Sequence, residues 1–73
     1  MDYSDKAKAW RERAGFTVSQ LSELSGFAPE TIYAFERGKR PGGGEISDFS
    51  WQRYRLICSG IDQQIRTGQV FQW

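Results

Sequence analysis

Three positive side chains, Arg37, Lys39 and Arg40, lie within four residues of one another. Guanidinium and ammonium groups this close together suit contacts with phosphate oxygens. They follow a segment in which Glu30, Tyr33, Ala34 and Arg37 would share one face of a helix, at i, i+3, i+4 and i+7. The same cations also suit the negative end of a helix, where positive charge is favoured without any ligand. The sequence therefore predicts either an anion-binding helix end or a solvated charge cluster.

Catalytic and metal chemistry have few candidate residues. The chain has no histidine, and Cys58 is its only cysteine. These counts exclude a histidine-based triad, a histidine metal site and an intrachain disulfide. The glycine run at 42–44 lacks the Gly-Lys-Ser/Thr ending of a phosphate-binding loop. We expect no enzyme, metal or cofactor, and we interpret Cys58 as a small core residue.

The composition is that of one globular domain, spanning 1–73, with a modest core. Charged residues make up 26% and hydrophobic residues 38%, and the net charge is only +1, whereas a nucleic-acid binder is usually clearly basic. The amino terminus is acidic and polar, unlike a signal peptide, and the apolar runs are too short to cross a membrane. We expect a cytoplasmic protein without a membrane segment.

Capping residues and apolar periodicity predict three helices in the first forty residues. The first covers about 4–14, with Ser4 as its N-cap. The second follows a Thr17–Gln20 capping box. The third runs from Pro29, a favourable first position, to about residue 37. We expect the buried side chains of these helices to include Trp10, Leu21, Leu24, Ile32 and Phe35.

After a flexible glycine-rich linker at 41–44, two more helices are predicted. One covers about 48–59 with Asp48 or Ser50 as its cap, and Gly60 ends it. A short one covers 61–67, with Ile65 facing inward, and Gly68 ends it. The tail, 69–73, alternates polar and apolar residues, which is typical of a strand or an extended arm. The predicted fold is all-α, a compact domain of four or five helices with a short extended C-terminal tail. The last two helices and the tail together cover 48–73.

Two short helices joined by a tight turn containing Gly26 have the layout of a helix-turn-helix, with its core at about 17–37. The chain resembles the Cro and phage-repressor type, the XRE-type helix-turn-helix regulators. The resemblance is close over about 6–40 and looser through 54–61. The segments that carry it are Gly15-Phe16-Thr17, Leu21-Ser22-Glu23, Gly26-Phe27-Ala28, Thr31-Ile32 and Phe35-Glu36-Arg37-Gly38-Lys39-Arg40.

The resemblance implies a bacterial or phage transcription regulator, such as a repressor, whose third helix enters the major groove of double-stranded DNA. Val18 and Ala28 stand where family members often carry side chains that bond to DNA. Glu30 can accept from a cytosine amino group, but it also suits the positive end of a helix without DNA. The residues expected to face base edges are Pro29, Glu30, Tyr33 and Ala34.

The same resemblance implies phosphate contacts at the start of the second helix, Thr17 to Ser19, through free N–H groups. Arg11 and Glu36 match positions that commonly pair in the family, which would tie the first helix to the third. The remaining phosphate contacts would come from Arg37, Lys39 and Arg40.

Two kinds of partner other than DNA remain open. Regulators of this family often act as homodimers, and the helices after residue 48 and the tail, with Phe71 and Trp73, are the candidate dimer surface. Alternatively, the chain is a protein-interaction module that keeps the helix-turn-helix frame without reading DNA. The near-neutral charge, the start of the third helix at 28–30 and the aromatic tail favour that alternative.

Overall fold

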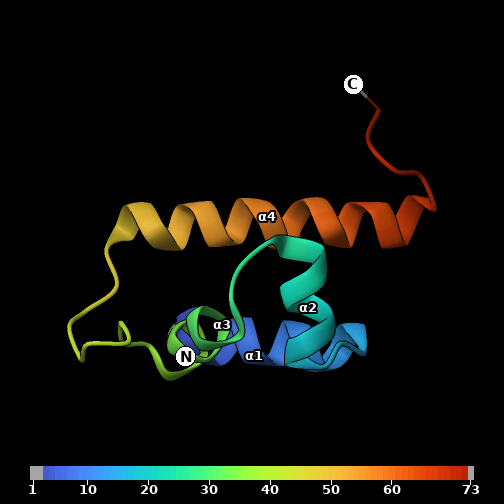
Figure 1. Ribbon diagram of the computed structural model, residues 1–73. Helices are drawn as coiled ribbons and strands as arrows, with labels where there is room; N and C mark the ends of the chain where they lie inside the picture. The colour runs from blue at the N-terminus through green and yellow to red at the C-terminus, as the bar shows by residue number, and fades with distance from the viewer. Residues whose placement is uncertain (1–2, 73) are drawn as a thin grey trace.

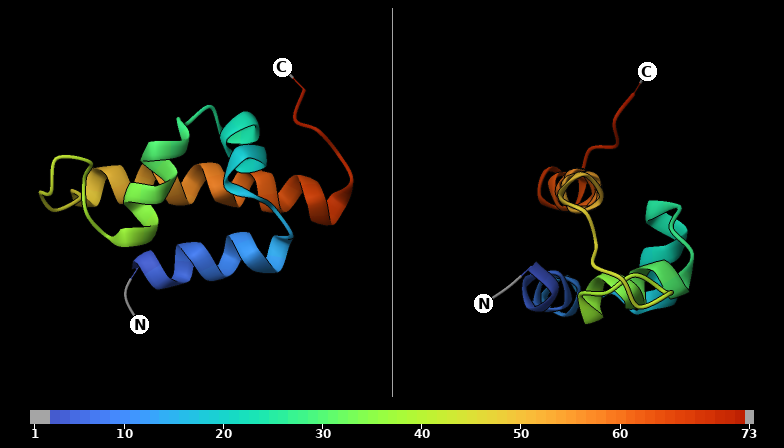
Figure 2. Two further views of the ribbon diagram at one scale, coloured as in Figure 1. Left: turned by 60° about the horizontal axis from the view of Figure 1, so that its bottom comes forward. Right: turned by 90° about the vertical axis from the view of Figure 1, so that its left-hand side faces the viewer.

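The computed structural model describes residues 3–72 as four helices joined by short connections (Figure 1). In chain order they are α1 (Tyr3–Ala14), α2 (Val18–Ser25), α3 (Pro29–Arg37) and α4 (Asp48–Thr67). α1 packs on α3, while α2 contacts both α3 and α4. Seen end on, α1, α4 and the α2–α3 pair surround a common interior (Figure 2). The predicted all-α fold class is confirmed, with four helices in the described part of the chain.

Local sequence sets the ends of α2 and α3. The Gln20 N–H donates to the Thr17 hydroxyl at 3.1 Å, and the Thr17 N–H donates to the Gln20 side chain at 2.9 Å, which confirms the capping box. Gly26 ends α2 and Gly38 ends α3, with φ of 79° and 80° in the left-handed region that glycine tolerates best. Pro29 occupies the first turn of α3. The predicted position of the two helices is confirmed.

The start of α1 differs from the prediction. The helix begins at Tyr3, so Ser4 lies inside it and is not its N-cap. Ser4 is buried against the end of α3, where a β-carbon built on Gly38 would lie 3.3 Å from its Oγ. A small side chain at residue 4 lets the two chain segments approach closely.

α4 is one continuous helix of 20 residues, which corrects both the predicted break at Gly60 and the predicted separate helix over 61–67. Cys58 and Ile61, on either side of the glycine, pack against the core. Burying two such side chains stabilises the helix by more than the roughly 1 kcal/mol that glycine costs inside it. The helix ends at Gly68, as predicted, with φ of 69°.

The N-cap of α4 is Ser47, which corrects the prediction of Asp48 or Ser50. The hydroxyl of Ser47 accepts a hydrogen bond from the Ser50 N–H at 3.1 Å. Ser47 precedes the acidic residue of the first turn, so the cap and the helix dipole are both satisfied.

The connection between α3 and α4 has defined structure, although the sequence predicts a linker too flexible for it. The Arg40 N–H donates to the Gly44 carbonyl at 2.7 Å, and the Gly43 N–H donates to the Arg40 carbonyl at 2.8 Å. Lys39 and Glu45 form an isolated antiparallel bridge beside this turn. The glycines therefore allow a tight reversal of the chain, with φ of 95° at Gly43.

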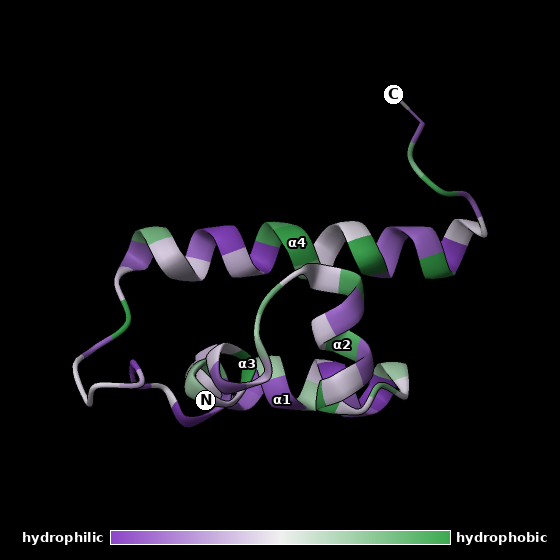
Figure 3. Ribbon diagram, in the orientation of Figure 1, coloured by the Kyte–Doolittle hydropathy of each residue, from purple (hydrophilic) through white to green (hydrophobic). Residues whose placement is uncertain are grey.

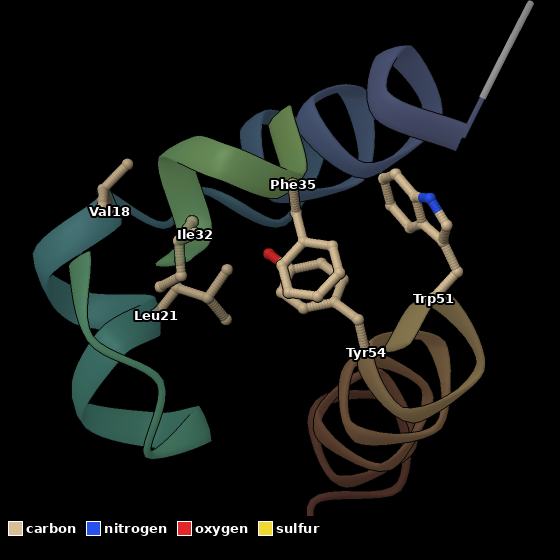
Figure 4. Packing of buried hydrophobic residues seen from close by; sticks show 6 residues of the cluster. All are labelled: Val18, Leu21, Ile32, Phe35, Trp51 and Tyr54. Carbon is tan, nitrogen blue, oxygen red and sulfur yellow. The ribbon is translucent and has the colours of Figure 1, made fainter. Parts of the chain in front are cut away.

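Six side chains form the buried core and come from α2, α3 and α4 (Figure 4). The ring of Phe35 stacks on Tyr54 at 4.1 Å between centroids and meets Trp51 edge-on at 5.0 Å. Such aromatic pairs contribute about 0.5–1.5 kcal/mol each beyond the area they bury. Trp10, predicted in the core, is partly buried and packs against it. The six core residues are Val18, Leu21, Ile32, Phe35, Trp51 and Tyr54.

Two apolar side chains predicted to be buried are exposed. Leu24 is exposed because α2 turns Val18 and Leu21 inward, so Leu24 lies off the buried face. Ile65 is exposed because the last turns of α4 extend past the other helices (Figure 1). Apolar residues continue from these turns into the tail, as the hydropathy colouring shows (Figure 3).

The tail has no regular secondary structure over the described residues 69–72, so it is an extended arm and not a strand. Val70 and Phe71 are exposed. Trp73, predicted to take part in dimerisation, lies outside the described residues. Among residues 3–72, no helix has both the length and the apolar character needed to cross a membrane.

Candidate nucleic-acid interface

α3 presents a narrow face of exposed polar side chains. Glu30, Tyr33 and Arg37 recur at i, i+3 and i+7, which places them on one side of the helix. Tyr33 leaves 52% of its surface exposed. Pro29 is exposed at the start of the helix, and the N-cap Ala28 makes no side-chain hydrogen bond. The face therefore offers a carboxylate, a phenol and a guanidinium, with an apolar ring at its beginning.

Ala34 does not belong to this face, which corrects the prediction that it faces base edges. The residue is 3% exposed and lies in the interior of the domain. The predicted i, i+4 relation to Glu30 is correct as helical geometry, but the buried arc of α3 is wide enough to include Ala34 beside Phe35. A methyl group fits there, whereas a long side chain would displace the neighbouring helices.

A bidentate ion pair holds α3 against α1. Arg11 donates to Glu36 from Nε at 2.6 Å and from an amino nitrogen at 3.0 Å, and the side chains are only 13% and 7% exposed. Its other amino nitrogen donates to the Phe16 carbonyl at 2.8 Å. The hydrogen bond with Glu36 raises the pKa of Arg11 above its usual value. The pairing implied by the family resemblance is confirmed.

Two serines that the sequence reasoning missed set the turn between α2 and α3. The Ser22 hydroxyl donates to the Phe27 carbonyl at 2.6 Å, and the Phe27 N–H donates to the Ser25 hydroxyl at 3.2 Å. Phe27 itself packs on Phe35 and Tyr54. Serines next to a helix-ending glycine are a local signal for such side-chain bonds to the backbone, and this signal was available in the sequence.

The start of α2 has unused hydrogen-bond donors. The capping box occupies the Gln20 N–H, but the N–H groups of Val18 and Ser19 have no acceptor within the helix. The side chains of Thr17 and Ser19 are exposed, while the Val18 side chain is part of the core. This end of the helix can therefore receive an anion through backbone donors and short hydroxyls.

The positive cluster of Arg37, Lys39 and Arg40 lies at the C-terminal end of α3 and on the turn that follows. Arg37 ends the helix, and the Lys39 N–H bonds back to the Ala34 carbonyl at 3.1 Å, so the cluster starts from an ordered backbone. Lys39 and Arg40 are exposed on the structured connection. Glu45 is an exposed acid on the same connection, and Glu30 is another in the first turn of α3. Both limit the net positive charge of this side of the domain. The cations are placed for local phosphate contacts and not for a broad basic surface.

Among residues 3–72, no group of three or more His, Cys, Asp or Glu side chains is placed to hold a metal ion.

Comparison with known proteins agrees with this arrangement. Neither the curated proteins nor the solved structures include a significant match. The family described as helix-turn-helix matches residues 8–49, more than half of the chain. The chain belongs to the Cro/repressor, XRE-type helix-turn-helix family of DNA-binding regulators.

Proposed function

We propose that this chain is a small sequence-specific DNA-binding regulator that places α3 in the major groove and acts as a homodimer. The observation that carries the proposal is the exposed face of α3, formed by Glu30, Tyr33 and Arg37 on a helix that α1 and α2 hold in place. The major groove, about 12 Å wide, admits an α-helix with its side chains.

Sequence readout would rest on few groups. The Glu30 carboxylate can accept from the amino group of cytosine, and the Tyr33 hydroxyl can donate or accept at a base edge. The exposed ring of Pro29 can contact a thymine methyl. Ala34 is buried and takes no part. We expect a short recognition motif in each half-site, because each base contact adds only about 1–3 kcal/mol of discrimination.

Phosphate contacts would supply most of the affinity. We assign them to Arg37, Lys39 and Arg40, and at the other end to Thr17 and Ser19 with the free N–H groups of the first turn of α2. Each cation that neutralises a phosphate adds about 0.9 to the slope of log affinity against log salt.

The homodimer would use α4 and the tail. Phe49 and Leu56 are exposed large apolar residues seven apart on α4, and Val70 and Phe71 add to them in the tail. A two-fold dimer would place its recognition helices in half-sites about 34 Å apart. Sedimentation equilibrium measures the oligomeric state of the wild type and of a Phe49→Ser, Leu56→Ser variant. The variant should be monomeric at concentrations where the wild type is a dimer.

The test of DNA recognition is selection of bound sequences from random DNA, followed by salt titration. A palindromic motif and a steep salt dependence are expected. Arg37→Ala and Lys39→Ala should weaken all sequences alike and flatten the slope, whereas Glu30→Ala should change the motif. Lys8→Ala, which removes an exposed cation on α1 outside the proposed contact and dimer surfaces, is the matched control and should change neither. Recovery of no motif, together with binding that ignores salt, would contradict the proposal.

A protein-interaction module is the second candidate function. The exposed apolar arm at Val70 and Phe71 and the net charge of +1 favour it. A complex recovered from nuclease-treated lysate, and lost on Phe71→Ser but not on Arg37→Ala, would support this candidate over DNA binding.

A further inference from the structure

A groove of about 380 Å³ lies between α1 and α4, and none of its lining residues comes from α2 or α3. α1 and α4 are bridged here by side chains: Tyr3 lies 5.4 Å from Trp51 between ring centroids, and Trp10 Nε1 donates to Asp62 at 3.1 Å. Pockets for small organic ligands typically occupy about 300–1,000 Å³, so the groove has room for one. It is separate from the face of α3 assigned to DNA.

The floor of the groove is aromatic and apolar. Trp51 and Tyr54 come from the core cluster, Trp10 packs on that cluster, and Ala7 and Cys58 lie among them. The partly buried indole of Trp10 can present a flat surface to an aromatic or aliphatic body, while Trp51 and Tyr54, 8% and 2% exposed, form the packed base beneath it. The floor is held by the core, so it is formed before any ligand binds.

The rim of the groove is positively charged. Four cations line it, Lys6, Arg13, Arg55 and Arg66, against one carboxylate, Asp62, which is a difference of three positive charges. Arg66 pairs with Asp62 at 2.7 Å. Within the described residues 3–72, no carboxylate lies within salt-bridge distance of Lys6, Arg13 or Arg55.

The position of Arg55 supports a role for this charge in binding. Its guanidinium carbon lies 5.7 Å from the centre of the Tyr3 ring, a cation–π distance. The contact holds a positive group beside the aromatic floor without neutralising it. By contrast, the segment 17–45, which holds the helix-turn-helix and the connection after it, carries three cations and four acids and has no net positive charge.

We propose that this groove binds a small organic anion, with an aromatic or aliphatic body on the Trp10–Trp51 floor and its anionic group between Lys6 and Arg55 or at Arg13. The aromatic floor suits the apolar body of the ligand. Lys6, Arg13 and Arg55, which have no carboxylate at salt-bridge distance within residues 3–72, suit its negative charge. The proposal is independent of DNA binding, because the two sites share no residue.

The full chain, free of DNA, is titrated with 8-anilinonaphthalene-1-sulfonate, a fluorescent probe with an aromatic body and one negative charge. Isothermal titration gives the stoichiometry. One site per chain is expected. The neutral analogue N-phenyl-1-naphthylamine has the same body without the charge, and it should bind about fivefold more weakly, as expected for loss of an exposed ion pair.

Variants locate the charge. Either the Lys6→Gln, Arg55→Gln double variant or the separate Arg13→Gln variant should lower the affinity for the sulfonate, and the one that does so locates the anionic group. The affinity for the neutral analogue should stay unchanged in both. Arg53→Gln lies on α4 outside the groove and is the matched control. Circular dichroism verifies that every variant stays folded.

Three results would overturn the proposal. The first is no saturable binding of the sulfonate. The second is equal affinity for the sulfonate and the neutral analogue. The third is a loss of affinity in Arg53→Gln as large as in the groove variants, which would indicate non-specific attraction to positive charge.

Discussion

Glu36 and Ala34 lie two residues apart on α3 and show how much a single position depends on its surroundings. Glu36 is an ionised side chain that is almost fully covered, because Arg11 meets both of its oxygens. Ala34 is covered because it is small and adjoins the core arc. Neither position is free to contact DNA, although a helical pattern alone would assign Ala34 to the exposed face.

The Arg11–Glu36 pair should matter more to stability than any other ion pair described here. Replacing Arg11 by Met leaves the Glu36 carboxylate covered and unpaired, so we expect a loss of about 3 kcal/mol in the free energy of unfolding. Urea denaturation measures it. The Arg11→Met, Glu36→Leu double variant should be less destabilised than Arg11→Met alone. Arg66→Ala, which breaks an exposed pair, should cost no more than about 0.5 kcal/mol.

Cys58 should be chemically inert in the folded protein. Burial raises the pKa of its thiol to about 11, so the reactive thiolate is scarce at neutral pH. A disulfide reagent at pH 8 should label the native chain slowly and the chain in guanidinium chloride rapidly. Because the pKa is raised in the folded state, labelling should accelerate as the pH approaches 11 even without denaturant. Rapid labelling of the folded chain at pH 8 would contradict the burial of the thiol.

At the scale of the element, α4 differs most from what its sequence predicts. Gly60, in the middle of α4, is a residue type that commonly ends a helix, yet it is helical here. A β-carbon at this position would meet no atom within 4 Å. Gly68 is of the same type but is a true end, with φ of 69°. Residue type alone does not distinguish these two positions.

The two glycines therefore predict opposite effects of one substitution. Gly60→Ala should stabilise the chain by about 0.5–1 kcal/mol, because alanine prefers helix and has space. Gly68→Ala should destabilise it by about 1 kcal/mol, because alanine disfavours positive φ. Thermal denaturation of both variants is the measurement. Destabilisation by Gly60→Ala would indicate that the helix ends there, as the sequence predicts.

At the scale of the whole molecule, Asp62 joins α4 to α1. It accepts a hydrogen bond from Trp10 on α1 and pairs with Arg66 on its own helix. The hydrogen bond from Trp10, and then Arg66, lower the pKa of Asp62. These contacts brace the groove between α1 and α4, so the ionised form of Asp62 belongs to the folded arrangement.

Acid should remove this brace. A carboxylate with a lowered folded-state pKa contributes stability that is present above its unfolded pKa and lost as the pH falls through the folded one. At pH 7 the melting temperature of the wild type should exceed that of Asp62→Asn, and the difference should shrink as the pH falls below about 3.9, the unperturbed value. A difference that stays constant from pH 7 to strongly acidic pH would exclude a contribution from the charge.

The helix-turn-helix frame follows from local sequence alone. Its determinants act on backbone only a few residues away, through capping hydrogen bonds and preferred backbone angles, so their effects can be predicted without knowing the fold. They are the Thr17–Gln20 capping box, Gly26, Pro29 and Gly38. The positions of Glu30, Tyr33 and Arg37 on one exposed face of α3 were predictable for the same reason, since i, i+3 and i+7 spacing is a property of any helix. The same pattern wrongly placed Ala34 on that face, because helical spacing does not show how wide the buried side is.

Which helix faces are covered depends on contacts between distant parts of the chain. The burial of Ala34 and Ser4, the exposure of Leu24 and the continuity of α4 through Gly60 depend on which helices meet, and these meetings join residues far apart in the sequence. The groove between α1 and α4 arises in the same way, because Tyr3 with Trp51 and Trp10 with Asp62 come together only on folding. Local preference sets the ends of α2 and α3, whereas burial, the larger free-energy term, decides which sides of the helices are covered and carries α4 through Gly60.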